Sequence, residues 1–333
     1  MRTEAIVFAA PSAVEVRAVD LPAPEPDEVL IRTVYSGVSQ GTERWMLLGR
    51  YNHMADDASA TYPCFPGYQA AGVVEAIGGA VADLKPGDRV IAAGTRFAEG
   101  PPISPGRASH CAHLVARRPD VARLGPDADL AGAALFVMAA VGRHGTRLAN
   151  VRAGERVLVI GQGMIGQMSA QAARMRGARV IATDLVADRV ARSAKFSADR
   201  AALVSGDELM ALVREEAPDG MDVVVDTTGN SRMFDTCLAL IRREGRLLLQ
   251  GYYPDPIVVD FHRAHLQRVT VVFPCGWDRD DDQMLADDLS RGVPTVGPLI
   301  THRVPYREAP EAYRLVVEHP EQCLGMVLHW SEP

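Results

Sequence analysis

The chain has 333 residues, 47 % of them hydrophobic and 23 % charged, and its formal net charge is −7. This length exceeds what one hydrophobic core usually supports, so we expect a globular protein of two domains. The negative charge argues against nucleic acid and acidic lipid as partners. The apolar runs are too short to span a membrane. The scattered cysteines favour a location in the reducing cytoplasm.

Short strands dominate the first 125 or so residues. The strand-like runs are residues 4–9, 14–19, 28–34, 70–77, 89–93 and 110–116. Proline and glycine supply the backbone angles of the turns between them, as in LKPGDRV (84–90). Such runs predict a β-rich domain of the barrel type. His110 and His113 lie in the last run and are expected to be structural histidines, and His53 lies in a loop expected to be solvated.

From Arg156 onward, strands alternate with helices. The expected strands are residues 156–161, 178–184, 201–204, 221–229, 245–253 and 269–273. The expected helices between them are residues 164–176, 187–196, 207–216 and 232–242. Apolar strands that alternate with helices predict a doubly wound parallel sheet covered on both faces. An acidic helix follows Trp277, and strand-like segments ending at 325–330 are expected to return to the first domain.

A dinucleotide fingerprint begins at the first of these parallel strands. Gly161-x-Gly163-x-x-Gly166 closes the strand and opens a helix, and Asp184 follows 23 residues after Gly161, at the end of the next strand. The glycines make a tight turn and let a pyrophosphate approach the helix start. Asp184 should bind the ribose hydroxyls and repel a 2′-phosphate, so NAD is favoured over NADP, although Arg189 lies one turn away.

Further residues are expected around the cofactor. They are Met164 and Ile165 at the helix start, Thr227 and Thr228 after the fourth strand, and Gly251 and Tyr252 after the fifth. Ligands collect at this carboxyl edge of a parallel sheet. The alternatives are that both threonines only cap the following helix, and that the glycine-rich turn binds nothing.

The whole pattern resembles the medium-chain dehydrogenase/reductase superfamily. The matching stretches are SGVSQGTE (36–43), FPGYQAAGVVEAIG (65–78), LKPGDRV (84–90), the fingerprint at 161–166, VVVDTTG (223–229) and GMVL (325–328). The resemblance implies a GroES-like catalytic domain of residues 1–126 and 275–333, and a Rossmann domain of residues 127–274. The Gly-Val-Ser-x-Gly-Thr-Glu form is similar to a zinc-independent branch that includes the bacteriochlorophyllide a dehydrogenases. The resemblance also implies a homodimer that joins Rossmann sheets edge to edge, or a tetramer of such dimers.

The chain departs from the zinc pattern of this superfamily at each expected ligand. Ser39 stands where a cysteine is expected, with Gln40 as an extra residue, and Gly67-Tyr68-Gln69 replaces Gly-His-Glu. The third ligand should fall within residues 135–140, which contain no ligand, and residues 94–109 lack the cysteines of the structural zinc lobe. These side chains cannot form the shell that catalytic zinc needs, so no metal is expected.

Without zinc, other groups must take the hydroxyl proton or stabilise charge on the reacting oxygen. The candidates are Tyr68, Thr42, Glu43 and Ser39, and Gln69 is a further possible hydrogen-bonding residue. Tyr68 donates to a ketone or, with a lowered pKa, accepts from an alcohol. The structural alternatives are that Tyr68 fills the vacated metal cavity, that Thr42 is a helix N-cap, and that Glu43 is an acid at a helix start or paired with an arginine.

The leading functional hypothesis is a zinc-independent, NAD-dependent dehydrogenase that interconverts a small secondary alcohol and a ketone. One alternative is an NAD(P)H-dependent quinone or enone reductase, against which Asp184 argues because such enzymes usually take NADPH. Another is a catalytically silent NAD-binding protein, since no strong acid–base pair replaces the zinc.

Overall fold

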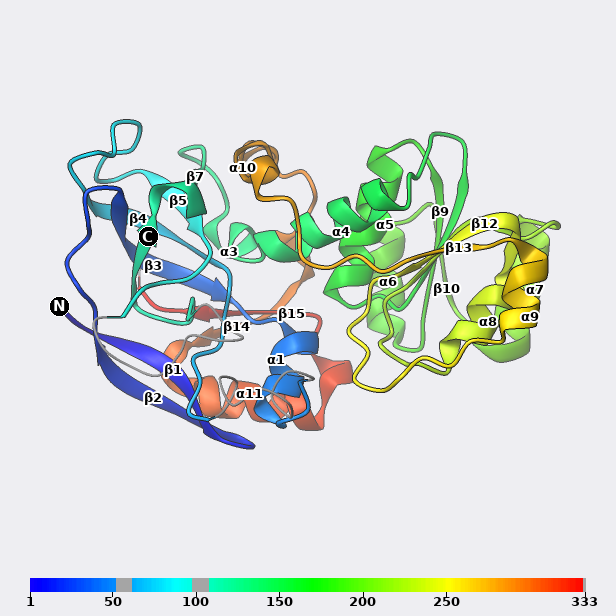
Figure 1. Ribbon diagram of the computed structural model, residues 1–333, viewed down its shortest axis with the longest axis horizontal. Coiled ribbons are helices and arrows are strands. Elements are labelled where there is room, and N and C mark those ends of the chain that lie inside the picture. The colour runs from blue at the N-terminus through cyan, green and yellow to red at the C-terminus, as the bar shows by residue number, and fades with distance from the viewer. Residues whose placement is uncertain (52–61, 98–107, 332–333) are drawn as a thin grey trace. The chain divides into compact units, whose positions relative to one another are not determined.

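The computed structural model describes residues 1–51, 62–97 and 108–331 (Figure 1). His53 and most of the segment expected to lack the structural zinc lobe lie outside these residues. The chain divides into two compact units, one of residues 1–137 and 279–333, and the other of residues 138–278. None of the described helices is long and apolar enough to cross a membrane.

The first unit is built on a seven-stranded, mostly antiparallel sheet. Six strands lie in the order β14, β15, β3, β4, β5, β7, and β6 pairs with β3. Their bounds are Glu28–Gly37 (β3), Ala70–Ile77 (β4), Arg89–Ala92 (β5), His113–Arg117 (β6), Val121–Arg123 (β7), Ile300–Pro305 (β14) and Gly325–His329 (β15). The C-terminal strand β15 therefore lies inside the sheet, between β14 and β3.

A separate hairpin of β1 (Arg2–Ala10) and β2 (Ala13–Asp20) belongs to the same unit. Side chains of a strand alternate between its two faces, and both faces of β1 are buried. Ala5 and Val7 join the core of strands β3 to β7, while Ile6 and Phe8 join a second core with Tyr313 and other C-terminal residues. The N- and C-terminal parts of the chain thus share one core.

Short helices complete the first unit. They are α1 (Gln40–Leu47), α3 (Leu130–Ala133), α10 (Asp282–Ser290) and α11 (Ala309–Glu318), and α4 (Phe136–Leu148) continues from this unit into the second. Single 3₁₀ turns occupy residues 118–120, 279–281, 297–299, 306–308 and 320–322.

The strand expected at 110–116 begins only at His113. Residues 110–112 instead pair with β1: the N–H of Ile6 donates to the carbonyl of His110 at 2.9 Å, and the N–H of Ala112 donates to that of Glu4 at 2.8 Å. The backbone bends because it leaves one partner strand for another. His110 is therefore held beside β1 and the second core, and its side chain is 1 % exposed.

The second unit is a six-stranded parallel sheet in the order β10, β9, β8, β11, β12, β13 (Figure 1). The strands are Arg156–Ile160 (β8), Arg179–Asp184 (β9), Arg200–Leu203 (β10), Met221–Asp226 (β11), Ile241–Leu249 (β12) and Thr270–Val272 (β13). The helices are Met164–Met175 (α5), Ala187–Phe196 (α6), Gly206–Glu216 (α7), Met233–Leu240 (α8) and Phe261–Gln267 (α9). The strand order reverses at β8, as in doubly wound folds.

Both faces of this sheet are covered. Val157 and Val159 of β8 pack in a cluster with residues of α5, whereas Leu158 and Ile160 pack in a cluster with residues of α7 and α8. The strands are continuously apolar because their alternate side chains pack against helices on opposite faces of the sheet. The predicted α/β class, a β-rich domain combined with a doubly wound Rossmann sheet, is confirmed.

Candidate functional site

The predicted phosphate turn joins β8 to α5 in the second unit. Gly161 has a φ of +87°, in the left-handed region that glycine adopts without strain. A Cβ at Gly166 would lie 1.9 Å from the carbonyl oxygen of Gly161, so only glycine lets the helix pack this closely on the turn. A Cβ at Gly163, the residue that precedes α5, would meet no described atom within 4 Å. The space in front of the helix start is thus open.

Residues at the ends of β11 and β12 close around this turn. The hydroxyl of Thr227 donates to the carbonyls of Ile160 and Gly161, at 3.1 and 2.9 Å, and so ties the two strand ends together. The Thr228 hydroxyl accepts from the N–H of Asn230 at 3.1 Å, in a turn that precedes α8 by several residues. Neither threonine caps α8, whose N-cap residue is Arg232, so that alternative is wrong. A Cβ at Gly251 would lie 2.6 Å from the backbone nitrogen of Gly229.

Asp184 is the last residue of β9 and is half-buried. Its Oδ2 accepts from the N–H of Gln162 at 2.5 Å, and its Oδ1 accepts from the N–H of Val186 at 2.8 Å. These two bonds fix a negative charge directly beside the phosphate turn.

The other predicted cofactor residues surround the same edge of the sheet. Met164 and Ile165 form the first turn of α5, and Tyr252 follows Gly251 and is partly exposed. The carbonyl of Arg189 accepts from Nε2 of Gln167 at 3.2 Å, which joins α6 to α5.

Gln162 has a part in this turn that its sequence position did not indicate. It is fully buried, its amide donates to the carbonyls of Val159 and Gly161, and it accepts from the hydroxyl of Ser193.

These features together fit a dinucleotide. The open start of α5 offers unpaired backbone N–H groups and the positive end of the helix dipole to a pyrophosphate. The carboxylate at the end of β9 suits ribose hydroxyls.

The candidate catalytic residues lie in the first unit, around the start of α1. The side chains of Ser39 and Thr42 lie near enough to the Tyr68 hydroxyl to act on its pKa by hydrogen bonding. Burial and the negative charge of Glu43 raise the pKa of Tyr68 above its usual range, although both hydrogen bonds oppose the shift. Thr42 lies within the first turn of α1, whose N-cap residue is Ser39, so the alternative that Thr42 is the N-cap is wrong.

Glu43 is fully buried and its carboxylate has three hydrogen-bond partners. Oε1 accepts from the backbone N–H of Ser39 at 3.1 Å. Oε2 accepts from the Tyr313 hydroxyl at 2.5 Å and lies 3.1 Å from Nε2 of His110. The expected arginine partner is not among these contacts. Sequence reasoning did not identify Tyr313, and it gave His110 only a structural part.

Gln69, a possible hydrogen-bonding residue for substrate or cofactor, instead bonds to backbone groups. It is fully buried, its Nε2 donates to the carbonyl of Gly37 at 3.3 Å, and its Oε1 accepts from the N–H of Val137 at 3.0 Å. The amide is used to join backbone segments.

The residues at the zinc-ligand positions do not fit a zinc ion. Ser39, Tyr68 and Gln69 offer hydroxyl and amide groups in place of thiolate, imidazole and carboxylate. Within residues 1–51, 62–97 and 108–331, no three His, Cys, Asp or Glu side chains are grouped so that they could hold a metal ion.

Two protein-family models match the chain. The alcohol dehydrogenase GroES-like domain matches residues 25–139, and the zinc-binding dehydrogenase domain matches residues 165–287. The chain is 28 % identical to the 2-desacetyl-2-hydroxyethyl bacteriochlorophyllide A dehydrogenase of Cereibacter sphaeroides, and the match covers 99 % of each chain. It is also 28 % identical to human sorbitol dehydrogenase, over 92 % of this chain and 91 % of the human one.

Solved structures share the fold. An Escherichia coli oxidoreductase of unknown specificity involved in membrane biogenesis has a TM-score of 0.85 at 23 % identity, over the full length of both chains. A putative zinc-binding dehydrogenase from Sinorhizobium meliloti, bound to NADP, has a TM-score of 0.82 at 21 % identity, over 99 % of each chain. The family that the two models define binds NAD(P) and usually zinc. Together the two models match more than two thirds of the residues, and the chain belongs to the medium-chain, zinc-type alcohol dehydrogenase family of oxidoreductases that act on CH–OH groups.

Proposed function

We propose that this protein is an NAD-dependent dehydrogenase that interconverts a secondary alcohol and a ketone without a catalytic zinc ion. The observation that carries the proposal is the phenol of Tyr68, which replaces a zinc-ligand residue of the family pattern and lies near the side chains of Ser39 and Thr42. The tyrosine hydroxyl is the group that meets the substrate oxygen.

The state of Tyr68 decides what it does to that oxygen. Burial and the charge of Glu43 raise the pKa of Tyr68, so its phenol stays protonated at neutral pH and acts as a donor rather than a base. A donor aimed at a ketone oxygen stabilises the negative charge that develops there during reduction. Thr42 and Ser39 orient the phenol through their hydrogen bonds. This arrangement favours ketone reduction as the working direction.

The cofactor of the proposal is NAD(H), bound on the second unit. Gly161, Gly163 and Gly166 with the start of α5 would hold the pyrophosphate, and Asp184 would hold the ribose. Bound NADH would supply the hydride, which no side chain of this protein can provide. The fixed charge of Asp184 beside the turn opposes a 2′-phosphate, so NADP is disfavoured.

The proposal is tested by assaying ketones with NADH and secondary alcohols with NAD before and after extensive chelation. The panel contains polyols and 1-arylethanols, because the relatives are named for a polyol and for a hydroxyethyl side chain. We expect turnover that survives chelation in a preparation without stoichiometric zinc. Activity that chelation abolishes and added zinc restores would overturn the metal-free mechanism.

A second set of assays separates this reaction from the reduction of conjugated double bonds. Quinones and enones are offered with NADH and with NADPH under the same conditions. Turnover confined to these acceptors would replace the alcohol–ketone assignment with that of a reductase. Tight NADH binding without turnover on either panel would favour a silent binding protein.

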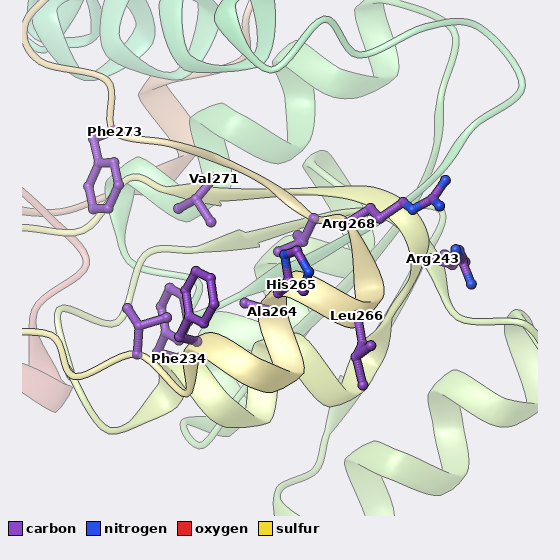
Figure 2. A pocket seen from close by; sticks show the side chains of 11 residues that line it. Phe234, Arg243, Ala264, His265, Leu266, Arg268, Val271 and Phe273 are labelled. Atoms are coloured by element: carbon purple, nitrogen blue, oxygen red, sulfur yellow. The ribbon is translucent and has the colours of Figure 1, made fainter.

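We further propose that the protein is a homodimer joined at β13, the outermost strand of its parallel sheet. A pocket of about 700 Å³ lies there, lined mainly by apolar side chains, with His265, Arg243 and Arg268 among its residues (Figure 2). Phe261 and Phe273 beside it are 76 % and 67 % exposed. An edge strand beside exposed aromatic rings is suited to a self-complementary contact with a second copy.

Light scattering after size exclusion tests the dimer. We expect the wild type to have twice the 35.9 kDa mass of the chain, and Phe273→Asp to shift it toward the monomer. Leu203→Asp is the matched control, because Leu203 is 52 % exposed on β10, the opposite edge strand of the same sheet. A monomeric wild type would contradict the proposal, and a mass of four chains would indicate a tetramer of such dimers.

A further inference from the structure

A buried chain of hydrogen bonds runs beneath the candidate catalytic residues of the first unit. The indole Nε1 of Trp330 donates to the hydroxyl of Ser36 at 2.8 Å, and this hydroxyl lies 2.7 Å from Nδ1 of His110. Nε2 of His110 lies 3.1 Å from Oε2 of Glu43. Ser36, His110 and Glu43 are each at most 1 % exposed.

The donors and acceptors in this series of hydrogen bonds are compatible with one position of the histidine proton, on Nε2. An indole N–H can only donate, so the Ser36 oxygen accepts from Trp330 and has its own proton available for Nδ1 of His110. A neutral imidazole that accepts at Nδ1 carries its proton on Nε2. That proton points to the carboxylate of Glu43, which is an acceptor. Every group in the chain is then satisfied by one tautomer.

The order serine, histidine, glutamate is also that of a nucleophilic triad. Here it cannot serve one, because the Ser36 hydroxyl is sealed from solvent and already accepts the Trp330 N–H.

The series of hydrogen bonds ends at Glu43, in the segment that carries the candidate catalytic hydroxyls. Glu43 receives His110 on Oε2 and holds the backbone N–H of Ser39 on Oε1. Ser39, which makes this bond, and Thr42, which precedes Glu43, are the residues whose side chains act on the pKa of Tyr68. Tyr313 supports the same carboxylate from α11.

We propose that His110 is a positioning residue of this enzyme: locked as the Nε2–H tautomer by Ser36, it fixes the Glu43 carboxylate and thereby the Ser39–Thr42 segment that orients Tyr68. This role rests on the proposed function of Tyr68. His110 itself touches neither substrate nor cofactor.

Two substitutions at His110 separate positioning from simple filling of the core. A glutamine amide reaches about as far as Nε2 of histidine and can still donate to Glu43, whereas an asparagine amide reaches only as far as Nδ1. We expect His110→Asn to lower kcat at least tenfold with KM for NADH within twofold, and His110→Gln to restore most of the loss. Equal kcat values for the two variants would overturn the positioning role.

Nuclear magnetic resonance tests the proposal without any turnover. Nitrogen-15 spectra of the wild type should show the proton of His110 on Nε2, and Ser36→Ala should release the other tautomer. The ¹³Cζ signal of Tyr68, assigned by its loss in Tyr68→Phe, should move in His110→Asn and stay in place in His110→Gln. A proton on Nδ1 in the wild type, or a Tyr68 signal that neither variant moves, would refute the inference.

These spectra distinguish the two possible failures. If no alcohol or ketone is turned over but the spectra behave as expected, the proposed function fails and the positioning network stands. If turnover is found and His110→Asn leaves both kcat and the Tyr68 signal unchanged, only the network fails.

Discussion

At the scale of single residues, the proposed reaction depends on the phenol of Tyr68 as a hydrogen-bond donor. We expect Tyr68→Phe to lower kcat for ketone reduction more than tenfold, because one donor to a developing oxyanion is worth about 10² to 10³ in rate. Steady-state kinetics with NADH measure this, and KM for NADH should stay within twofold. Tyr62→Phe is the control, since the Tyr62 hydroxyl donates to the backbone carbonyls of Met46 and Leu47, in the last turn of α1. A near-normal kcat in Tyr68→Phe would remove Tyr68 from the mechanism.

A second residue, Asp184, is expected to set cofactor choice. Asp184→Asn keeps the shape of the side chain but removes the charge beside the phosphate turn, so a 2′-phosphate is no longer repelled. We expect the ratio of the Kd for NADPH to that for NADH to fall at least tenfold, as measured by fluorescence titration. Asp188→Asn, which removes an exposed acid paired with Arg192 on α6, should leave the ratio unchanged. If both variants behave alike, the ribose assignment is wrong.

At the scale of elements, the β8–α5 turn offers two alanine substitutions with opposite expectations. Gly166→Ala would place a Cβ 1.9 Å from a backbone oxygen, so we expect it to destabilise the fold by about 1–3 kcal/mol. Gly163→Ala meets no described atom and should leave the thermal midpoint of the free protein nearly unchanged. Its methyl group would instead enter the space for the pyrophosphate and weaken NADH binding at least tenfold. Thermal unfolding and NADH titration of both variants test this, and normal NADH affinity in Gly163→Ala would contradict the assignment.

The same scale shows why parts of this molecule could be predicted from sequence. The parallel sheet and its glycine turn are local: Gly161, Gly166 and Asp184 lie on consecutive elements, and the order strand, helix, strand brings them together. The surroundings of Glu43 are not local. Its partners are His110, which is 67 residues away, and Tyr313, which is 270 residues away. No periodicity connects such positions. His110 reaches Glu43 because residues 110–112, just before β6, pair with β1.

At the scale of the whole molecule, buried acids should make stability fall at high pH. Burial raises the pKa of Cys64 to about 11 and of Cys111 to about 12, and it also raises the pKa of Tyr68 and Tyr313. Unfolded thiols ionise near pH 8.5 and unfolded phenols near pH 10. Above these values the unfolded chain loses protons that the folded chain keeps, so the free energy of unfolding decreases as pH rises.

We therefore expect the thermal midpoint to fall progressively above about pH 8.5 and more steeply above about pH 10. Thermal unfolding followed by circular dichroism from pH 7 to 11 measures this. Cys111→Ala should show a shallower fall between pH 8.5 and 10 than the wild type. A midpoint that stays constant up to pH 11 would contradict the assignment of these groups as buried and protonated.

The arrangement of the sheet in the first unit has a consequence for synthesis of the protein. β15 lies between β14 and β3, and Tyr313 and Trp330 bind Glu43 and Ser36. Residues 138–278 are continuous and can form their domain as soon as they leave the ribosome, since domains fold as units during translation. The domain that begins the chain must wait, with an open edge at β3, until the final strand emerges. The second unit of the nascent protein can thus be complete before the sheet of the first unit closes.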